Sequence, residues 1–173
     1  SDDIPDSVVH VNEYSVFRKD RNGAIGGGVM CYISKNMFSR VLDLETRNDL
    51  NFEMLWLLVR PRLLSRPLSI VIVAVLYCPS WYNADLCSKL SRYLVSCVNE
   101  LHRKYNHPCF LIVGDFNSLD CKLFNKYLHL KQLVINPTRG ENILDKIFTN
   151  KSDFLISLLP FHLWAGVIMF VST

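Results

Sequence analysis

The feature that most constrains the fold is an apolar run over residues 68–77, which reads Leu-Ser-Ile-Val-Ile-Val-Ala-Val-Leu-Tyr. The run is rich in β-branched residues and is nearly continuous rather than alternating, which is typical of a strand that is buried on both faces. We therefore predict a central strand. Such a strand needs neighbouring strands and a covering layer on each face, so the chain is expected to fold as a layered domain.

A long amphipathic helix is predicted over residues 84–104, directly after this strand. Apolar residues recur there at spacings of three and four, which places them on one stripe. The stripe comprises Leu86, Leu90, Tyr93, Leu94, Cys97, Val98 and Leu101. Asp85 is the expected cap of the helix, and His107-Pro108 ends it. A second buried strand is predicted over residues 109–113.

Further strands and a short helix complete an α/β domain. Residues 13–18 and 28–34 are predicted to form a hairpin around a glycine-rich turn. Single strands are expected over residues 52–59 and 143–149, and a short helix over residues 119–129. No linker or repeat interrupts the pattern, so residues 1–173 are treated as one domain.

Composition excludes several classes of protein. Half of the 173 residues are hydrophobic and a fifth are charged, which excludes a disordered or collagen-like chain. The net charge of +3 neither requires nor forbids a nucleic-acid partner. Six cysteines show no C-x-x-C spacing and no zinc pattern, so we expect core thiols in a reducing, intracellular compartment, either nuclear or cytoplasmic.

The C-terminal segment over residues 154–172 contains no Asp, Glu, Lys or Arg. Its length is sufficient to cross a bilayer, which makes a membrane-tethered protein one alternative. Pro160, His162 and Gly166 interrupt the segment, and no basic cluster follows it. We therefore favour two buried segments joined at Pro160, with residues 154–173 as a degenerate apolar C-terminus and no membrane partner.

The strongest sign of chemistry is Gly114-Asp115-Phe116-Asn117 at the end of the second buried strand. Ligands gather at the carboxyl ends of strands in open α/β sheets. Asp115 is suited to bind a hard cation or deprotonate water, and Asn117 to hold a phosphate oxygen. The alternative is an Asx turn, in which both side chains serve the local backbone. Asp145, inside an apolar strand, is expected to need a His or Arg partner.

A series of short motifs strengthens this interpretation. In chain order they are Arg18-Lys19-Asp20-Arg21, Gly26-Gly27-Gly28-Val29, Tyr77-Cys78-Pro79, Gly114-Asp115-Phe116-Asn117, Pro137-Thr138-Arg139-Gly140 and Leu144-Asp145. The series spans about residues 8–150 and resembles the endonuclease/exonuclease/phosphatase superfamily. Within it, the chain is most similar to the apurinic-endonuclease-like endonuclease domain of non-LTR retrotransposons.

The resemblance implies a four-layer α/β sandwich of two packed mixed sheets flanked by helices, and phosphodiester hydrolysis with Mg²⁺ or Mn²⁺. Asp115 would orient or deprotonate water and contact the metal ion, while Asn117 would hold the water and the phosphate. Tyr77 would donate a hydrogen bond to the phosphate, and Asp145 would orient a catalytic histidine. Arg139 would contact a phosphate of the DNA partner. A reverse transcriptase domain of the parent element would be a further partner.

The sequence also departs from this family. Active members carry an early Asn and a metal-binding Glu, and the chain begins after that place, so we expect a fold that is incomplete at the N-terminus. Three glutamates lie outside the motif context: Glu13, Glu45 and Glu53. Ala165 and Gly166 occupy the positions of the terminal Asp-His, and His162 comes four residues early. Three other histidines are expected in surface or capping roles: His102, His107 and His129.

The function predicted from the sequence is therefore a DNA endonuclease domain of a non-LTR retroelement that is inactive or only weakly active. Loss of several members of a catalytic unit leaves little chemistry, so the sequence does not establish an enzyme. Two alternatives keep the same fold. One is a non-catalytic binding module, a pseudoenzyme, and the other is a phosphatase or an RNA-cleaving nuclease.

Overall fold

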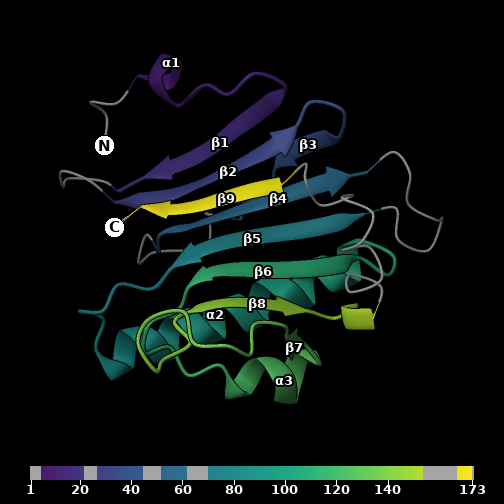
Figure 1. Ribbon diagram of the computed structural model, residues 1–173. Helices are drawn as coiled ribbons and strands as arrows, with labels where there is room; N and C mark the ends of the chain where they lie inside the picture. The colour runs from purple at the N-terminus through teal and green to yellow at the C-terminus, as the bar shows by residue number, and fades with distance from the viewer. Residues whose placement is uncertain (1–4, 22–26, 45–51, 62–69, 154–166, 173) are drawn as a thin grey trace.

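The computed structural model describes residues 5–21, 27–44, 52–61, 70–153 and 167–172, and three helices and nine strands follow one another along them (Figure 1). In chain order they are α1 (Asp6–Val9), β1 (Tyr14–Asp20), β2 (Gly28–Ser34), β3 (Phe38–Val41), β4 (Met54–Arg60), β5 (Val71–Tyr77), α2 (Ala84–Lys104), β6 (Cys109–Asp115), α3 (Lys122–Leu128), β7 (Lys131–Gln132), β8 (Asp145–Thr149) and β9 (Val167–Ser172). The protein is an α/β protein, as predicted.

A six-stranded sheet forms the centre of the molecule, in the order β3-β4-β5-β6-β8-β7. Only β5 and β6 run parallel to each other, and the remaining neighbours in this sheet are antiparallel. All seven residues of β5 are buried. The predicted central strand is therefore confirmed. Its neighbours β4 and β6 are almost entirely buried as well.

A second sheet packs against the first and consists of β1, β2 and β9. The predicted hairpin is confirmed, since β1 pairs with β2 in antiparallel register from Tyr14 opposite Ser34 to Asp20 opposite Gly28. β9 pairs with the other edge of β2 and is also antiparallel. This sheet is thus not mixed, which corrects the expectation of two mixed sheets. Residues 154–166, most of the apolar C-terminal segment, lie outside the described residues.

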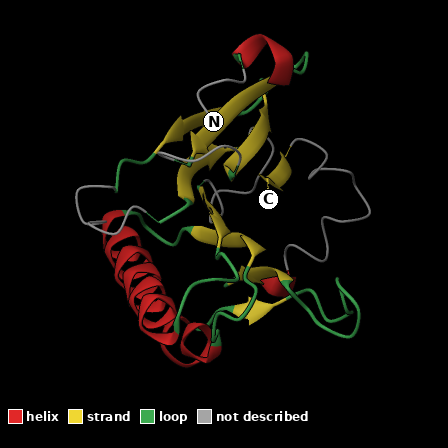
Figure 2. Ribbon diagram, turned by 90° about the vertical axis from the view of Figure 1, so that its left-hand side faces the viewer, coloured by secondary structure: helices red, strands yellow, loops and turns green. Residues whose placement is uncertain are grey.

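Two hydrophobic cores separate the layers because side chains alternate along each strand. One face of β4, β5 and β6 packs against β2 and forms a core that includes Cys31, Leu57 and Val73. The opposite face packs against α2 and α3 and includes Leu94 and Phe124. Helices α2 and α3 lie on the same side of the strands (Figure 2). On the small sheet, the Tyr32 hydroxyl donates to the Val9 carbonyl at the end of α1.

Helix α2 has the predicted bounds, but its cap differs from the prediction. Asn83, in extended conformation, accepts a hydrogen bond from the Leu86 N–H through Oδ1 at 2.9 Å. Asp85 is the second residue of the helix, in its first turn, and pairs with Lys89 instead. The expectation that Asp85 caps the helix was therefore wrong, because the cap must lie outside the first helical residue. None of the helices in the described ranges is long and apolar enough to span a membrane.

The remaining differences concern short or exposed elements. Strands β3 and β7 were not predicted, since β3 has no buried residue and β7 has only two residues. Helix α3 is shorter than predicted and ends at His129, which adopts a left-handed conformation. All six cysteines are free thiols, and Cys31 is among the four that are buried.

Gly114 is the backbone position at which β6 tolerates no side chain. It has φ +146°, and an added Cβ would overlap the carbonyl oxygen of Leu76 on β5. We expect Gly114→Ala to lower the free energy of unfolding by at least about 3 kcal/mol, measured by urea titration. Gly140→Ala is the matched control, because Gly140 has φ +59° but no atom within 4 Å of the added Cβ. Its cost should be about 1 kcal/mol, and equal costs would contradict the prediction.

Alkaline pH should destabilise the protein through its buried thiols. Burial raises the pKa of Cys31 to about 12 from an ordinary value of 9.0. Stability from this thiol is fully present below pH 9 and is lost as pH rises from 9 to 12. In that window each such thiol lowers the free energy of unfolding by about 1.4 kcal/mol per pH unit. Urea titrations at several pH values give the free energy of unfolding as a function of pH. Between pH 9 and 12 this free energy should fall less steeply for Cys31→Ala than for the wild-type protein. Equal slopes for the two proteins would refute the prediction.

Candidate functional site

The ends of four chain segments bring a row of polar residues together at one edge of the large sheet. Tyr77 on β5 pairs with Asp115 on β6, and Asp115 pairs with Asp145 on β8. The Tyr77 N–H donates to the backbone carbonyl of Glu53 at 2.9 Å, just before β4. We call these four residues the sheet-end row: Glu53, Tyr77, Asp115 and Asp145. The structure thus brings three of the predicted site residues together.

The side chains of the row share one face of the sheet. Tyr77 belongs to the core between the two sheets. Val113 belongs to the same core, so alternation along β6 turns Asp115 toward that side as well. Asp115 is only 4% exposed, and Tyr77 only 6%. Glu53, Tyr77 and Asp115 therefore form a buried polar strip at the carboxyl ends of the parallel strands, and Asp145 continues the row to the surface.

Asp115 and Asn117 form the Asx turn that was the alternative interpretation of this motif. Asp115 Oδ1 accepts a hydrogen bond from the Asn117 N–H at 3.0 Å. Asn117 has φ +41°, a left-handed conformation that asparagine tolerates better than most residues. Its side-chain amide donates to the Cys78 carbonyl at 2.9 Å and so ties the turn to the end of β5. The turn holds both side chains in place beside Tyr77.

The surroundings of the Tyr77 phenol raise its pKa above the ordinary value of 10.0, so it is protonated at neutral pH as a free phenol is. Burial raises its pKa, and the negative charge of Asp115 raises it further, while Arg21 acts in the opposite direction. A protonated phenol donates a hydrogen bond, which is the role that the sequence predicts for it.

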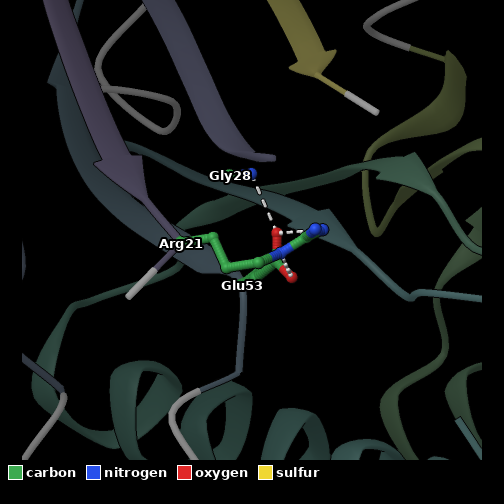
Figure 3. A network of polar contacts seen from close by, with 3 residues as sticks. All are labelled: Arg21, Gly28 and Glu53. Atoms are coloured by element: carbon green, nitrogen blue, oxygen red, sulfur yellow. Dashed lines mark hydrogen bonds and ion pairs between the residues drawn. The ribbon is translucent and has the colours of Figure 1, made fainter. Parts of the chain in front are cut away.

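An ion pair between Arg21 and Glu53 closes one side of the row (Figure 3). Arg21 follows β1. Its Nε lies 2.8 Å from Glu53 Oε1, and its Nη2 lies 3.2 Å from Glu53 Oε2. Glu53 Oε2 also accepts the Gly28 N–H at 2.9 Å, where β2 begins. Hydrogen bonding to Glu53 raises the pKa of Arg21. The pair therefore joins the small sheet to the large one at the site.

Two glycines allow the chain to pass so close to this ion pair. Gly27 has φ +90°, and a Cβ there would lie 2.7 Å from the Arg21 Nε and closer still to its Cζ and Nη2. Gly28 has φ +115°, and a Cβ there would lie 2.6 Å from the Lys19 carbonyl. Gly27 and Gly28 of the glycine motif thus have a structural reason, since they bring the Gly28 N–H onto the Glu53 carboxylate.

Sequence reasoning assigned no role to Arg21 and set Glu53 aside. A usable signal was present in the sequence, because Glu53 is a charged residue at the start of an apolar run. In the structure its exposed fraction is only 8%. A carboxylate in such a place needs a partner, the same argument that was applied to Asp145. The argument was sound but was made for the wrong residue.

Asp145 is exposed, because it is the first residue of β8 rather than an interior one. Its backbone N–H donates to Thr138 Oγ1, which also accepts from the Leu144 N–H, both at 3.0 Å. Within the described ranges, no His or Arg pairs with its carboxylate. The expectation that Asp145 lies inside a strand and needs a His or Arg partner was therefore wrong. The Thr138 hydroxyl explains how the Pro-Thr-Arg-Gly motif anchors the start of β8.

The remaining candidates lie on the surface. Arg139 is exposed, in a tight turn closed by hydrogen bonds between its own backbone and that of Asn142. His102, His107 and His129 are exposed, as predicted. His129 caps the end of α3 through its backbone N–H. His162, Ala165 and Gly166 fall outside the described residues.

A divalent metal ion does not fit the described part of the site. No group of three or more His, Cys, Asp or Glu side chains that could hold a metal ion occurs in the ranges that the structure describes. Mg²⁺ prefers anionic oxygens, yet both Glu53 oxygens are engaged by Arg21 and Gly28. Asp115 Oδ1 is engaged by the Asx turn. The predicted metal role of Asp115 thus gains no support from neighbouring ligands.

The Arg21–Glu53 pair should contribute measurably to stability, because its side chains are only 21% and 10% exposed. We expect Arg21→Met and Glu53→Gln each to cost about 2 kcal/mol. The double variant should cost less than the sum by at least about 1 kcal/mol, measured by urea unfolding. The matched control is the exposed Asp85–Lys89 pair on α2, whose coupling should be about 0.4 kcal/mol. Equal coupling in the two pairs would contradict the prediction.

Comparisons with protein families and with curated proteins identify no relative of this chain. No protein-family model matches the sequence, and none of the curated proteins compared with it is a match. The functional argument therefore depends on the residues of the site themselves.

Proposed function

We propose that this chain is an endonuclease-type domain of a non-LTR retroelement, in the endonuclease/exonuclease/phosphatase superfamily, that binds the phosphate backbone of DNA without cleaving it. The observation that carries the proposal is the pairing of Tyr77 with Asp115 at the carboxyl ends of two parallel strands, with Asn117 tied beside them. Two sheets packed face to face, with α2 and α3 on one outer face, correspond to three layers of the four-layer sandwich of that superfamily and support the proposal to that extent.

Phosphate binding at this site is assigned to three donors. Tyr77 carries a phenol that stays protonated, and Asn117 carries an amide with a second N–H beyond the one bonded to Cys78. Arg139 adds an exposed guanidinium in the turn that precedes β8. These groups recognise phosphate oxygens rather than base edges, so they position a strand without reading its sequence.

In the part of the chain that the structure describes, the groups that would activate water and hold a metal ion are neutralised or missing around these donors. Glu53 is neutralised by Arg21, and Asp145 has no histidine to orient within the described ranges. In the sequence, Ala165 and Gly166 replace the terminal Asp-His of active relatives. An enzyme that lacks its acid–base pair and a metal carboxylate loses most of its rate enhancement.

Plasmid nicking tests the absence of catalysis. We expect the protein with Mg²⁺ or Mn²⁺ to nick supercoiled plasmid no faster than Asp115→Asn, measured by gel electrophoresis. The Asn side chain keeps the acceptor of the Asx turn and removes only the charge, so this control preserves the local fold. Nicking by the wild-type protein that disappears in Asp115→Asn would show an active endonuclease and refute the pseudoenzyme.

Salt dependence tests the binding of the phosphate backbone. Removing one phosphate contact from duplex DNA lowers the slope of log K against log[salt] by about 0.9. We expect this change for Arg139→Gln in fluorescence anisotropy titrations at several salt concentrations. Arg103→Gln is the matched control, because Arg103 is exposed in the last turn of α2, away from the strand ends of the site. An unchanged slope for Arg139→Gln would remove Arg139 from the site, and salt-independent binding would refute the proposal.

A further inference from the structure

Trp81 is an exposed aromatic residue directly beside the sheet-end row. It is 62% exposed, whereas Trp56 in β4 is only 4% exposed. Its ring centroid lies 6.3 Å from that of Tyr77, with the two rings nearly perpendicular at 76°. Single exposed apolar side chains are common on protein surfaces, and what distinguishes Trp81 is its position next to the candidate phosphate donors.

The indole is held in place although it is exposed. The Arg21 guanidinium lies 5.0 Å from the Trp81 ring centroid and 5.8 Å from that of Tyr77. Arg21 is itself fixed by Glu53, so the cation that contacts the indole does not move freely. Edge contacts between aromatic rings and cation–π contacts both favour one ring orientation. The Arg21–Glu53 pair thus acts as a positioning device for Trp81.

The chemistry of a fixed, exposed indole next to phosphate donors suits a nucleobase. Aromatic side chains stack on bases of single strands, and this contact tolerates any base because each has a π face. In a regular duplex the bases already stack on one another, so their faces are not available. We propose that Trp81 stacks on an unpaired nucleobase of the strand whose phosphate lies at Tyr77 and Asn117. This inference rests on the proposed function and assigns its ligand class, a DNA strand with an unstacked base.

A matched control for Trp81 exists on the other side of the large sheet. Tyr127 in α3 is 55% exposed and has the Lys126 ammonium 5.1 Å from its ring centroid. It therefore shares exposure and a neighbouring cation with Trp81. It lies on the helical layer and not beside Tyr77, so it should take no part in stacking.

The test compares a 12-nucleotide single DNA strand of mixed sequence with a strand of equal length in which abasic residues replace the nucleotides. Both carry the same phosphates, and only the first has bases. We expect the wild-type protein to bind the strand with bases about 5- to 150-fold more tightly, by fluorescence anisotropy. Trp81→Ala should abolish this preference and leave the affinity for the abasic strand unchanged. Trp81→Phe should retain most of the preference, and Tyr127→Ala all of it.

The outcomes separate the two proposals. Equal affinity of the wild-type protein for the two strands would overturn stacking and leave the phosphate function standing. A preference that Trp81→Ala and Tyr127→Ala reduce equally would also overturn stacking at Trp81. If neither strand binds, the phosphate-binding function fails, and the assignment of Trp81 fails with it. Thermal unfolding of Trp81→Ala verifies that the variant is folded, as expected for a side chain on the surface.

Discussion

Burial of β5 on both faces is the constraint on which the rest of the structure depends. All seven of its residues are buried, so one layer must cover each face. The small sheet covers one face, and α2 with α3 covers the other. Because α2 connects β5 to β6, the two strands run parallel and end at the same edge. The candidate site is a consequence of this arrangement, since β5 and β6 end side by side with the polar residues Tyr77 and Asp115.

Electrostatics at that edge follow from the packing of the two sheets. Glu53 lies where the small sheet meets the large one, and its carboxylate would be costly there without a partner. Arg21 and the Gly28 N–H supply the compensation. The same pair that stabilises the junction also withdraws a carboxylate from metal binding and orients an exposed indole. A single interaction thus links stability, the proposed loss of catalysis and the proposed recognition of a base.

Most of the fold was predictable because its strands and its long helix carry strong patterns. The continuous apolar run of β5 and the stripe of α2 leave few alternatives, and α2 was found with the predicted bounds. Strands β3 and β7 were missed, since they form by pairing with β4 and β8 rather than by a pattern of their own. The site was predictable in part, because Tyr77, Asp115 and Asn117 lie where buried strands end. Arg21 and Glu53 were not, because their meeting joins residues 32 positions apart.

The sequence by itself determined the class of fold, the central strand and the polar residues that end it, since these follow from hydrophobic periodicity and from the cost of burying charge. Only the tertiary structure decided which carboxylate besides Asp115 is buried. Asp145 looked like an interior residue and is exposed, whereas Glu53 is buried against Arg21. The physical reason is that burial at the end of a strand depends on which layer packs over it. Over Glu53 that layer is supplied by the end of β1 and the start of β2, which are distant in sequence from β8.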